Sequence, residues 1–219
     1  MNTTPNSTNL NDLETELYQD VDKMLNSPDL ASVVEHGLTP LYGPLIQHPN
    51  LALITGQGGG ADNTIQSQAP NELLYLADPY KFGSTLRRYM DSSGLSNTLR
   101  QSTVAHAAVF PQAPTSQAGK WLNPSDPARR QWVTFSMKWN AALLKAQRPK
   151  AMVFFGEKAS KTFGINWSDT ERNHAQNHLT FGKSDWQGIP AFFCHHLSIG
   201  CPESEALRCF DRVAKSVGI

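Results

Sequence analysis

Short apolar runs alternate along the chain with segments that have the spacing or the capping residues of helices. Runs rich in branched and aromatic side chains that end at glycine, proline or polar residues are typical of buried parallel strands. The predicted strands are Leu51–Thr55, Ser102–Phe110, Ala151–Phe155 and Ala191–His196. The predicted helices are Leu10–Leu25, Asp29–Glu35, Phe82–Met90, one capped by Asp126 with Pro127 at its first position, Lys158–Phe163 and Glu203–Val217.

This alternation of strands and helices predicts an α/β fold, because a parallel strand is reached through a helix that packs on the sheet. We expect a three-layer α/β/α sandwich around a mainly parallel four-stranded sheet. Residues 10–219 would form a single domain, and the polar residues 1–9 a disordered tail. The polar stretch Gly164–Gly188 is interpreted as a hairpin or an insertion.

The glycine-rich segment after the first strand is the strongest candidate for a binding loop. It reads Gly56-Gln57-Gly58-Gly59-Gly60-Ala61-Asp62. Glycines permit a positive φ and keep side chains away from a ligand, and successive N–H groups in such a turn can bind one oxygen or phosphate. A flexible loop between a strand and a helix would have the same composition. In a parallel sheet, this segment would share its edge with the Pro111 loop, Glu157 and His195–Ser198, where open α/β sheets bind ligands.

Charge and cysteine content limit the classes of partner. The 19 basic and 19 acidic residues cancel, so a nucleic-acid contact would need a local basic surface or backbone amides. No apolar run approaches the length of a membrane span and the N-terminus lacks signal-peptide features, which predicts a cytoplasmic protein. Cys194, Cys201 and Cys209 contain no Cys-x-x-Cys pair, so we expect reduced, mostly buried thiols and no metal or cluster.

Four features in their order along the chain resemble the uracil-DNA glycosylase superfamily. They are a strand ending in Gly56-Gln57 and a small-residue loop, a strand followed by Pro111 and Pro114, the strand Met152–Phe155 followed by Gly156 and a helix, and a strand ending in His196-Leu197-Ser198. The resemblance covers roughly residues 50–200. The glycine-rich loop is most similar to the branch with Gly-Glu-Ala-Pro-Gly-Ala-Asp, but the cysteines that hold the iron–sulfur cluster of that branch are missing, so no cofactor is implied.

The resemblance implies an enzyme that flips a base out of DNA and hydrolyses its N-glycosidic bond. The departing base gains negative charge, so such a site needs a hydrogen-bond donor to the base and a group that positions water. By the resemblance the donor is His196, with His195 as the alternative. The carboxylate of Asp62 or the amide of Gln57 would handle the water. In the ordinary structural alternative, one histidine of the pair is buried and the other faces solvent.

The resemblance also implies residues that contact the base. The best-known members have an aspartate or asparagine and then a tyrosine or proline where this chain has Gly58 and Gly59, and the bulk of the second residue excludes pyrimidines substituted at carbon 5. Phe82 is the candidate for stacking on the base, and His106 stands where uracil-specific enzymes have an asparagine. Ordinary packing of Phe82 at a helix start and of His106 in the core are the alternatives.

Contacts with DNA would come from basic side chains and from the last loop. The candidate residues are Arg129, Arg130, Lys158, Lys161, Ser198 and Ile199, with Leu197 as an alternative to Ile199 for filling the vacated base stack. Solvated helix faces and plain loop packing are the ordinary interpretations.

The two glycines at 58 and 59 favour a substrate with a bulky 5-modified pyrimidine, such as glucosylated hydroxymethylcytosine of phage DNA. Its removal would be an antiviral activity, a role that follows only from the open site and the family analogy. One alternative is uracil excision in DNA repair. Another is a non-catalytic member that binds DNA or a protein. A monomer is expected.

Overall fold

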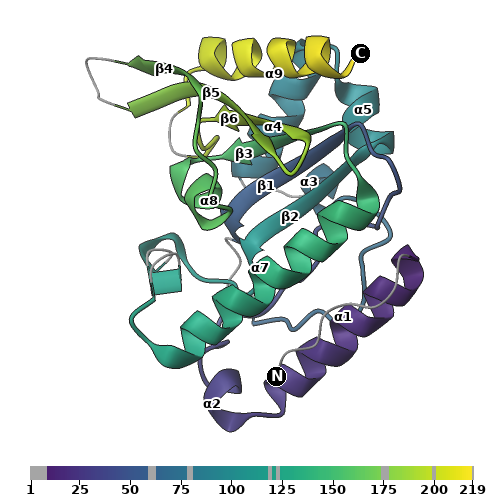
Figure 1. Ribbon diagram of the computed structural model, residues 1–219, viewed down its shortest axis with the longest axis vertical. Coiled ribbons are helices and arrows are strands. Elements are labelled where there is room, and N and C mark those ends of the chain that lie inside the picture. The colour runs from purple at the N-terminus through teal and green to yellow at the C-terminus, as the bar shows by residue number, and fades with distance from the viewer. Residues whose placement is uncertain are drawn as a thin grey trace.

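The computed structural model of the protein describes residues 9–58, 63–77, 81–117, 120–121, 124–173, 178–198 and 201–218. Its centre is a six-stranded sheet with the strand order β2-β1-β3-β6-β5-β4 (Figure 1). The strands are β1 (Leu51–Gln57), β2 (Thr103–Val109), β3 (Ala151–Phe155), β4 (Asp169–Asn173), β5 (His178–Trp186) and β6 (Ile189–Cys194).

The prediction of four parallel strands is confirmed, but the prediction of a four-stranded sheet is wrong. Strands β2, β1, β3 and β6 are parallel neighbours. Strands β5 and β4 extend the sheet as an antiparallel edge, and they form the hairpin expected within Gly164–Gly188. Strand β4 reads Asp-Thr-Glu-Arg-Asn. It contains no apolar residue, so the apolar pattern could not reveal it, and its pairing with β5 defines it instead.

The strand order places a topological switch point between β1 and β3. From β1 the chain moves to β2 on one side, and it then crosses back to β3 on the other side of β1. The connections therefore leave the carboxyl ends of β1 and β3 in opposite directions. Open α/β sheets bind their ligands at such a point, because the two diverging loops leave room between them.

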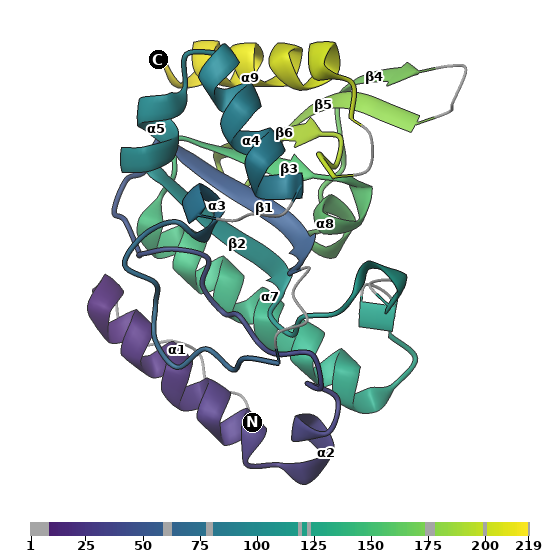
Figure 2. The ribbon, with the colours of Figure 1, turned by 180° about the vertical axis from the view of Figure 1, so that it is seen from behind.

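Helices cover both faces of the sheet. They are α1 (Leu10–Leu25), α2 (Pro28–Ala31), α3 (Leu74–Ala77), α4 (Lys81–Ser92), α5 (Ser96–Gln101), α7 (Pro127–Gln147), α8 (Glu157–Thr162) and α9 (Glu203–Val217), with a 3₁₀ turn η1 (Thr115–Gln117). Figure 1 shows α7 and α8 in front of the sheet, and Figure 2, seen from behind, shows α3, α4 and α5 over the other face. Helix α9 lies against β3 and β6 on that second face.

Two helix starts are capped by side chains, and the cap at Asp126 is the one predicted from the sequence. The side chain of Asn9 accepts a hydrogen bond from the Asn11 amide at 3.0 Å, and that of Asp126 accepts one from the Arg129 amide at 2.9 Å. Each satisfies a backbone donor that a helix start otherwise leaves unpaired. The helix predicted at Asp29–Glu35 is shorter and earlier than expected, since α2 covers Pro28–Ala31.

Successive side chains on the central strands point to opposite faces of the sheet and pack into two separate hydrophobic clusters. On β1, Leu51 and Leu53 pack with α4 and α9, whereas Ala52 and Ile54 pack on the face covered by α7 and α8. A third cluster joins α1 to α7 and contains Trp132 and Trp139. Phe135, on the same helix, is only partly buried and packs against this cluster. The side chain of any strand residue can therefore be assigned to one face by its place in the alternation.

Two further expectations concern membranes and cysteines. Within the part of the chain that the structure describes, no helix is long and apolar enough to cross a membrane. The three cysteines are free and buried, as expected. The hydrogen bonds that Cys194 makes with Cys201 and Cys209, together with burial, raise the pKa of the Cys194 thiol.

Candidate functional site

The candidate site lies where β1, β3 and β6 end. Strand β3 is followed by Gly156, whose φ of +90° is a conformation that residues with side chains rarely adopt. The amide of Gly156 donates to the carbonyl of Cys194 at 2.9 Å, which ties the ends of β3 and β6 together. A Cβ atom at Gly156 would lie 3.6 Å from the Cβ of His196. His196 therefore sits directly against the backbone at the end of β3.

His196 is held between an aromatic ring and a hydroxyl group. Its ring centroid lies 5.3 Å from that of Phe82, at the start of α4. Its Nδ1 atom is hydrogen-bonded to Oγ of Ser198 at 2.8 Å. Burial, with a smaller contribution from the neighbouring His195, lowers the pKa of His196 from 6.5 to about 4. The imidazole is therefore neutral at physiological pH.

His195 has different surroundings from His196. Its ring lies 4.9 Å from the ring of His178 on β5, and Nε2 of His178 is 3.9 Å from a carboxylate oxygen of Glu205 on α9. The structure thus brings His196, and not His195, together with Phe82. Both histidines are partly buried, so the structure does not show the alternative in which one is buried and the other faces solvent.

Gln57 is the last residue of β1 and continues the alternation of Leu53 and Thr55. The alternation directs its side chain to the face that carries Phe155 and Phe82. Both polar atoms of its amide are buried, and neither has a hydrogen-bond partner among the described residues. A buried amide without partners is costly, so native proteins rarely leave one without a ligand, water or neighbouring group to bind.

Gly58 does not leave an open space. A Cβ atom there would lie 1.9 Å from the hydroxyl oxygen of Tyr42 and 3.2 Å from Cγ of Gln112. The Tyr42 side chain already fills the volume that a larger residue at position 58 would need, so any side chain there would force a neighbour or the backbone to shift. The sequence-based interpretation of Gly58 as a missing obstacle is therefore wrong.

A row of aromatic rings connects this position to His196. The ring centroids of Tyr42 and Tyr75 are 5.5 Å apart, and those of Tyr75 and Phe82 are 5.0 Å apart. Phe82 also meets Phe155 of β3 edge-on at 5.1 Å. The hydroxyl of Tyr75 lies 3.4 Å from Oγ1 of Thr55 on β1. The aromatic row therefore follows the β1 and β3 ends on the same face as Gln57.

Sequence reasoning missed Tyr42, Tyr75 and Gln112. Gln112 follows β2, and the amide of the next residue, Ala113, donates to the carbonyl of Gly58 at 3.3 Å. Tyr42 belongs to the connection before β1, a segment without helix or strand periodicity. Its flanking glycine and proline mark a turn, but nothing in the turn indicates that it passes the end of β1.

His106 is not part of this group. It lies on β2 between Val104 and Ala108, which face α7, on the opposite side of the sheet from Phe82 and His196. Its Nε2 is hydrogen-bonded to Oε1 of Gln147 at 2.9 Å. Its side chain is 1% exposed, and this burial lowers its pKa to about 4. The placement agrees with core packing and not with base recognition.

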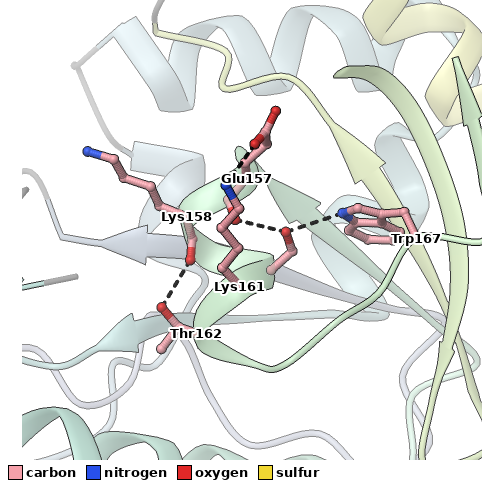
Figure 3. A network of polar contacts seen from close by, with 6 residues as sticks. Glu157, Lys158, Lys161, Thr162 and Trp167 are labelled. Atoms are coloured by element: carbon pink, nitrogen blue, oxygen red, sulfur yellow. Dashed lines mark hydrogen bonds and ion pairs between the residues drawn. The ribbon is translucent and has the colours of Figure 1, made fainter. Parts of the chain in front are cut away.

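The lysines of α8 differ in their surroundings, as Figure 3 shows. Nζ of Lys161 is 3.0 Å from the carboxylate of Glu157, and this hydrogen bond is the main cause of the lowered pKa of Glu157. The exposed Lys158 side chain points away from that ion pair, and no described residue forms an ion pair with it. Lys158 is thus the lysine of α8 whose charge is available to an anion.

Arg129 and Arg130 are both engaged at the start of α7. The guanidinium of Arg129 lies 5.6 Å from the centroid of the Trp121 ring. Arg130 donates to the backbone carbonyls of Ser125 and Pro124. Their contacts stabilise the loop before α7, and neither side chain contacts the His196 group.

Three predicted site residues, Gly59, Asp62 and Ile199, lie outside the described residues. Leu197, the alternative to Ile199, is buried in the core on the α9 side. Within the described ranges, no group of three or more His, Cys, Asp or Glu side chains is arranged to hold a metal ion. Models of known protein families give no match to the sequence, and no curated protein matches it.

Proposed function

We propose that the protein is a DNA glycosylase that flips a pyrimidine base and hydrolyses its N-glycosidic bond. The observation that carries this proposal is the neutral, partly buried imidazole of His196, bonded to Ser198 and packed on Phe82 beside the end of β3. The order of the sequence motifs, which resembles the uracil-DNA glycosylase superfamily, supplies the reaction.

His196 would stabilise the departing base. When the Ser198 hydroxyl donates to Nδ1, the single proton of the neutral ring is on Nε2, which can donate to an oxygen of the base. As water adds to C1′ of the sugar, the base leaves with the electron pair of the broken bond and becomes an anion. A preorganised donor to such an anion strengthens as the charge develops and so lowers the barrier.

Phe82 and Gln57 would hold the reactants. A flipped base can stack on an aromatic ring such as Phe82, which already lies 5.3 Å from His196. The amide of Gln57 offers one donor and one acceptor group without partners among the described residues, which suits binding of either the water or the base. Asp62 remains the carboxylate that the sequence offers for activating water.

Two pyrimidine classes compete as the substrate. The bulky 5-modified pyrimidine, with its antiviral role, was inferred from Gly58 and Gly59, and Tyr42 occupies the volume beside Gly58. The case for a bulky 5-modified pyrimidine therefore rests on Gly59 alone. The Tyr42 contact favours uracil, a pyrimidine without a 5-substituent, as the second candidate.

The proposal is tested on DNA duplexes that carry one uracil, 5-hydroxymethylcytosine or glucosylated 5-hydroxymethylcytosine. After incubation with excess protein, alkali cleaves the strand at abasic sites, and a denaturing gel measures the fraction cleaved. We expect cleavage of at least one duplex and a loss of about a hundredfold or more in His196→Ala. The matched control is His195→Ala, which removes the adjacent imidazole and should retain most of the rate.

Other outcomes separate the alternatives. Equal loss in both histidine variants, with both folded, would show that the Phe82 contact does not identify the catalytic ring. Binding of duplex DNA by fluorescence anisotropy without any cleavage would favour the non-catalytic DNA-binding member. Absence of both cleavage and DNA binding would exclude the proposal.

A further inference from the structure

We infer that Tyr42 is a specificity-determining residue that limits the size of the base accepted at the end of β1. The inference rests on the proposed function and concerns which bases the same site admits. The evidence is the short distance between the Tyr42 hydroxyl and the backbone at Gly58. The Tyr42 hydroxyl oxygen lies 1.9 Å from where a Cβ atom of Gly58 would be, directly beside Gln57.

The position of Tyr42 is fixed by its neighbours. Its carbonyl accepts a hydrogen bond from the Leu74 amide at 2.8 Å, and its ring packs on Tyr75. Just before it, the amide of Thr39 donates to the carbonyl of Phe110 at 3.0 Å, which anchors the segment beyond β2. The Tyr42 side chain is 8% exposed. A side chain so enclosed cannot swing aside for a ligand, so it acts as a rigid boundary.

The groups beside this boundary indicate a polar ligand edge. Gln112 is 9% exposed, and its Nε2 donates to Oγ1 of Thr39. Its Oε1 is buried and has no partner within the described ranges, like both amide atoms of Gln57. Gln57, which precedes Gly58, and Gln112, whose Cγ would lie 3.2 Å from a Cβ atom at Gly58, therefore both have buried hydrogen-bonding atoms without partners among the described residues. This pattern suits the polar edge of a base more than an apolar or bulky substituent.

The test compares bases that differ only at carbon 5. Single-turnover cleavage is measured on duplexes with uracil and 5-hydroxymethyluracil, and on duplexes with 5-hydroxymethylcytosine and its glucosylated form. The readout is the rate on the larger base divided by the rate on the smaller base of a pair. We expect Tyr42→Leu to raise this ratio about tenfold or more, because a clash opposes only the larger base. Tyr42→Phe, which removes only the hydroxyl, should raise it less.

Tyr89→Leu is the matched control. Tyr89 lies in the same core and is 4% exposed, but its ring packs under the Arg88 guanidinium on α4 and not against Gly58. Tyr89→Leu should lower the free energy of unfolding about as much as Tyr42→Leu does. Its ratio of cleavage rates on the larger and smaller bases should equal that of the wild type. Gln112→Met should lower the rates on both bases of a pair without changing their ratio. Unchanged rates in that variant would remove Gln112 from the base-binding site.

The outcomes distinguish this inference from the proposed function. If wild-type protein cleaves none of the four duplexes, the glycosylase proposal fails and the inference fails with it. If wild-type protein cleaves and Tyr42→Leu has the same ratio as Tyr89→Leu, only the role of Tyr42 is overturned. If Tyr42→Leu does not fold, the ratio of Tyr42→Phe decides, and a wild-type value there overturns the inference.

Discussion

At the scale of single residues, the Tyr42 side chain explains why position 58 is glycine, because its hydroxyl occupies the space that a Cβ atom would need. Gly58→Ala would place a methyl group 1.9 Å from the Tyr42 hydroxyl oxygen, and such overpacking typically costs about 1–3 kcal/mol. With Tyr42→Phe in place, the nearest remaining atoms are Cγ of Gln112 at 3.2 Å and Cζ of residue 42 at 3.3 Å. We therefore expect Gly58→Ala to cost less in that background.

Urea unfolding of the wild type, the two single variants and the double variant measures this coupling. Residues in direct contact typically show interaction free energies of about 0.5–3 kcal/mol. The double variant should thus be more stable than the sum of the single effects predicts. Additive effects would mean that the backbone at Gly58 shifts to accept the methyl group.

Ser198 provides a second prediction at this scale. If its hydroxyl selects the His196 tautomer with the proton on Nε2, Ser198→Ala should reduce single-turnover cleavage by about fivefold, the equivalent of one neutral hydrogen bond of ~1 kcal/mol. Ser198→Thr keeps the hydroxyl and should restore most of the rate. A threonine variant as slow as the alanine variant would argue for a packing role of Ser198 and not for orientation of the imidazole.

At the scale of elements, a helix or strand could be predicted from the sequence only where its apolar residues recur at a regular spacing or form a continuous run. The predicted bounds of α1 and α9 agree with the structure, and in α9 the buried residues Ala206, Phe210 and Val213 recur every three or four positions. Helix α5 was not predicted, because its six residues Ser96–Gln101 contain a single buried apolar side chain, Leu99. Short elements like α5 and β4 form because neighbouring segments complete their packing or pairing.

Helix α8 offers a matched pair of lysines for testing DNA contact. Lys158 is exposed with its charge available, whereas Lys161 is paired with Glu157 at 3.0 Å. Lys158→Ala should weaken binding of any duplex and reduce the slope of log affinity against log salt by about 1, because one phosphate contact is lost. Lys161→Ala should change that slope less. Equal slopes for both variants and wild type would place α8 away from the DNA.

At the scale of the whole molecule, the site was predictable where strand ends determine it. Gln57 and His196 follow different strands, and the parallel arrangement alone brings their strand ends to one edge. The contribution of Tyr42 was not predictable, since it depends on the path of a connection without periodicity. The sequence left both base contact and core packing open for His106, because β2 is buried on both faces and its sequence does not show which side each residue takes.

The three cysteines also show that contacts between different elements could not be predicted from the sequence. The sequence predicted mostly buried thiols, and the structure shows all three cysteines buried and without a disulfide. Their spacing gave no sign that Cys194 on β6 would meet Cys201 and Cys209, because that contact depends on how α9 returns to the sheet. Contacts between elements depend on their docking, which a single sequence pattern does not determine.

The two buried histidines together predict how the stability of the whole protein depends on pH. Burial lowers the pKa of both His106 and His196 from 6.5 to about 4. Between these values the unfolded chain binds a proton at each histidine and the folded protein does not. The stability from these groups is therefore complete above pH 6.5 and decreases as the pH falls toward 4, with a slope near pH 5 of about 1 kcal/mol per pH unit for each histidine.

Urea unfolding between pH 4.5 and 7.5 measures this slope in the wild type, His106→Leu, His196→Ala and the double variant. His106→Leu removes the hydrogen-bond partner of Gln147 and should lower stability at pH 7.5, yet its loss of stability on acidification should be shallower than in the wild type. The two histidines lie on opposite faces of the sheet, so their effects on the slope should add and the double variant should lose both increments. Parallel pH profiles for all four proteins would mean that both imidazoles take up a proton at the same pH in the folded protein as in the unfolded chain, and would contradict the lowered pKa of both histidines.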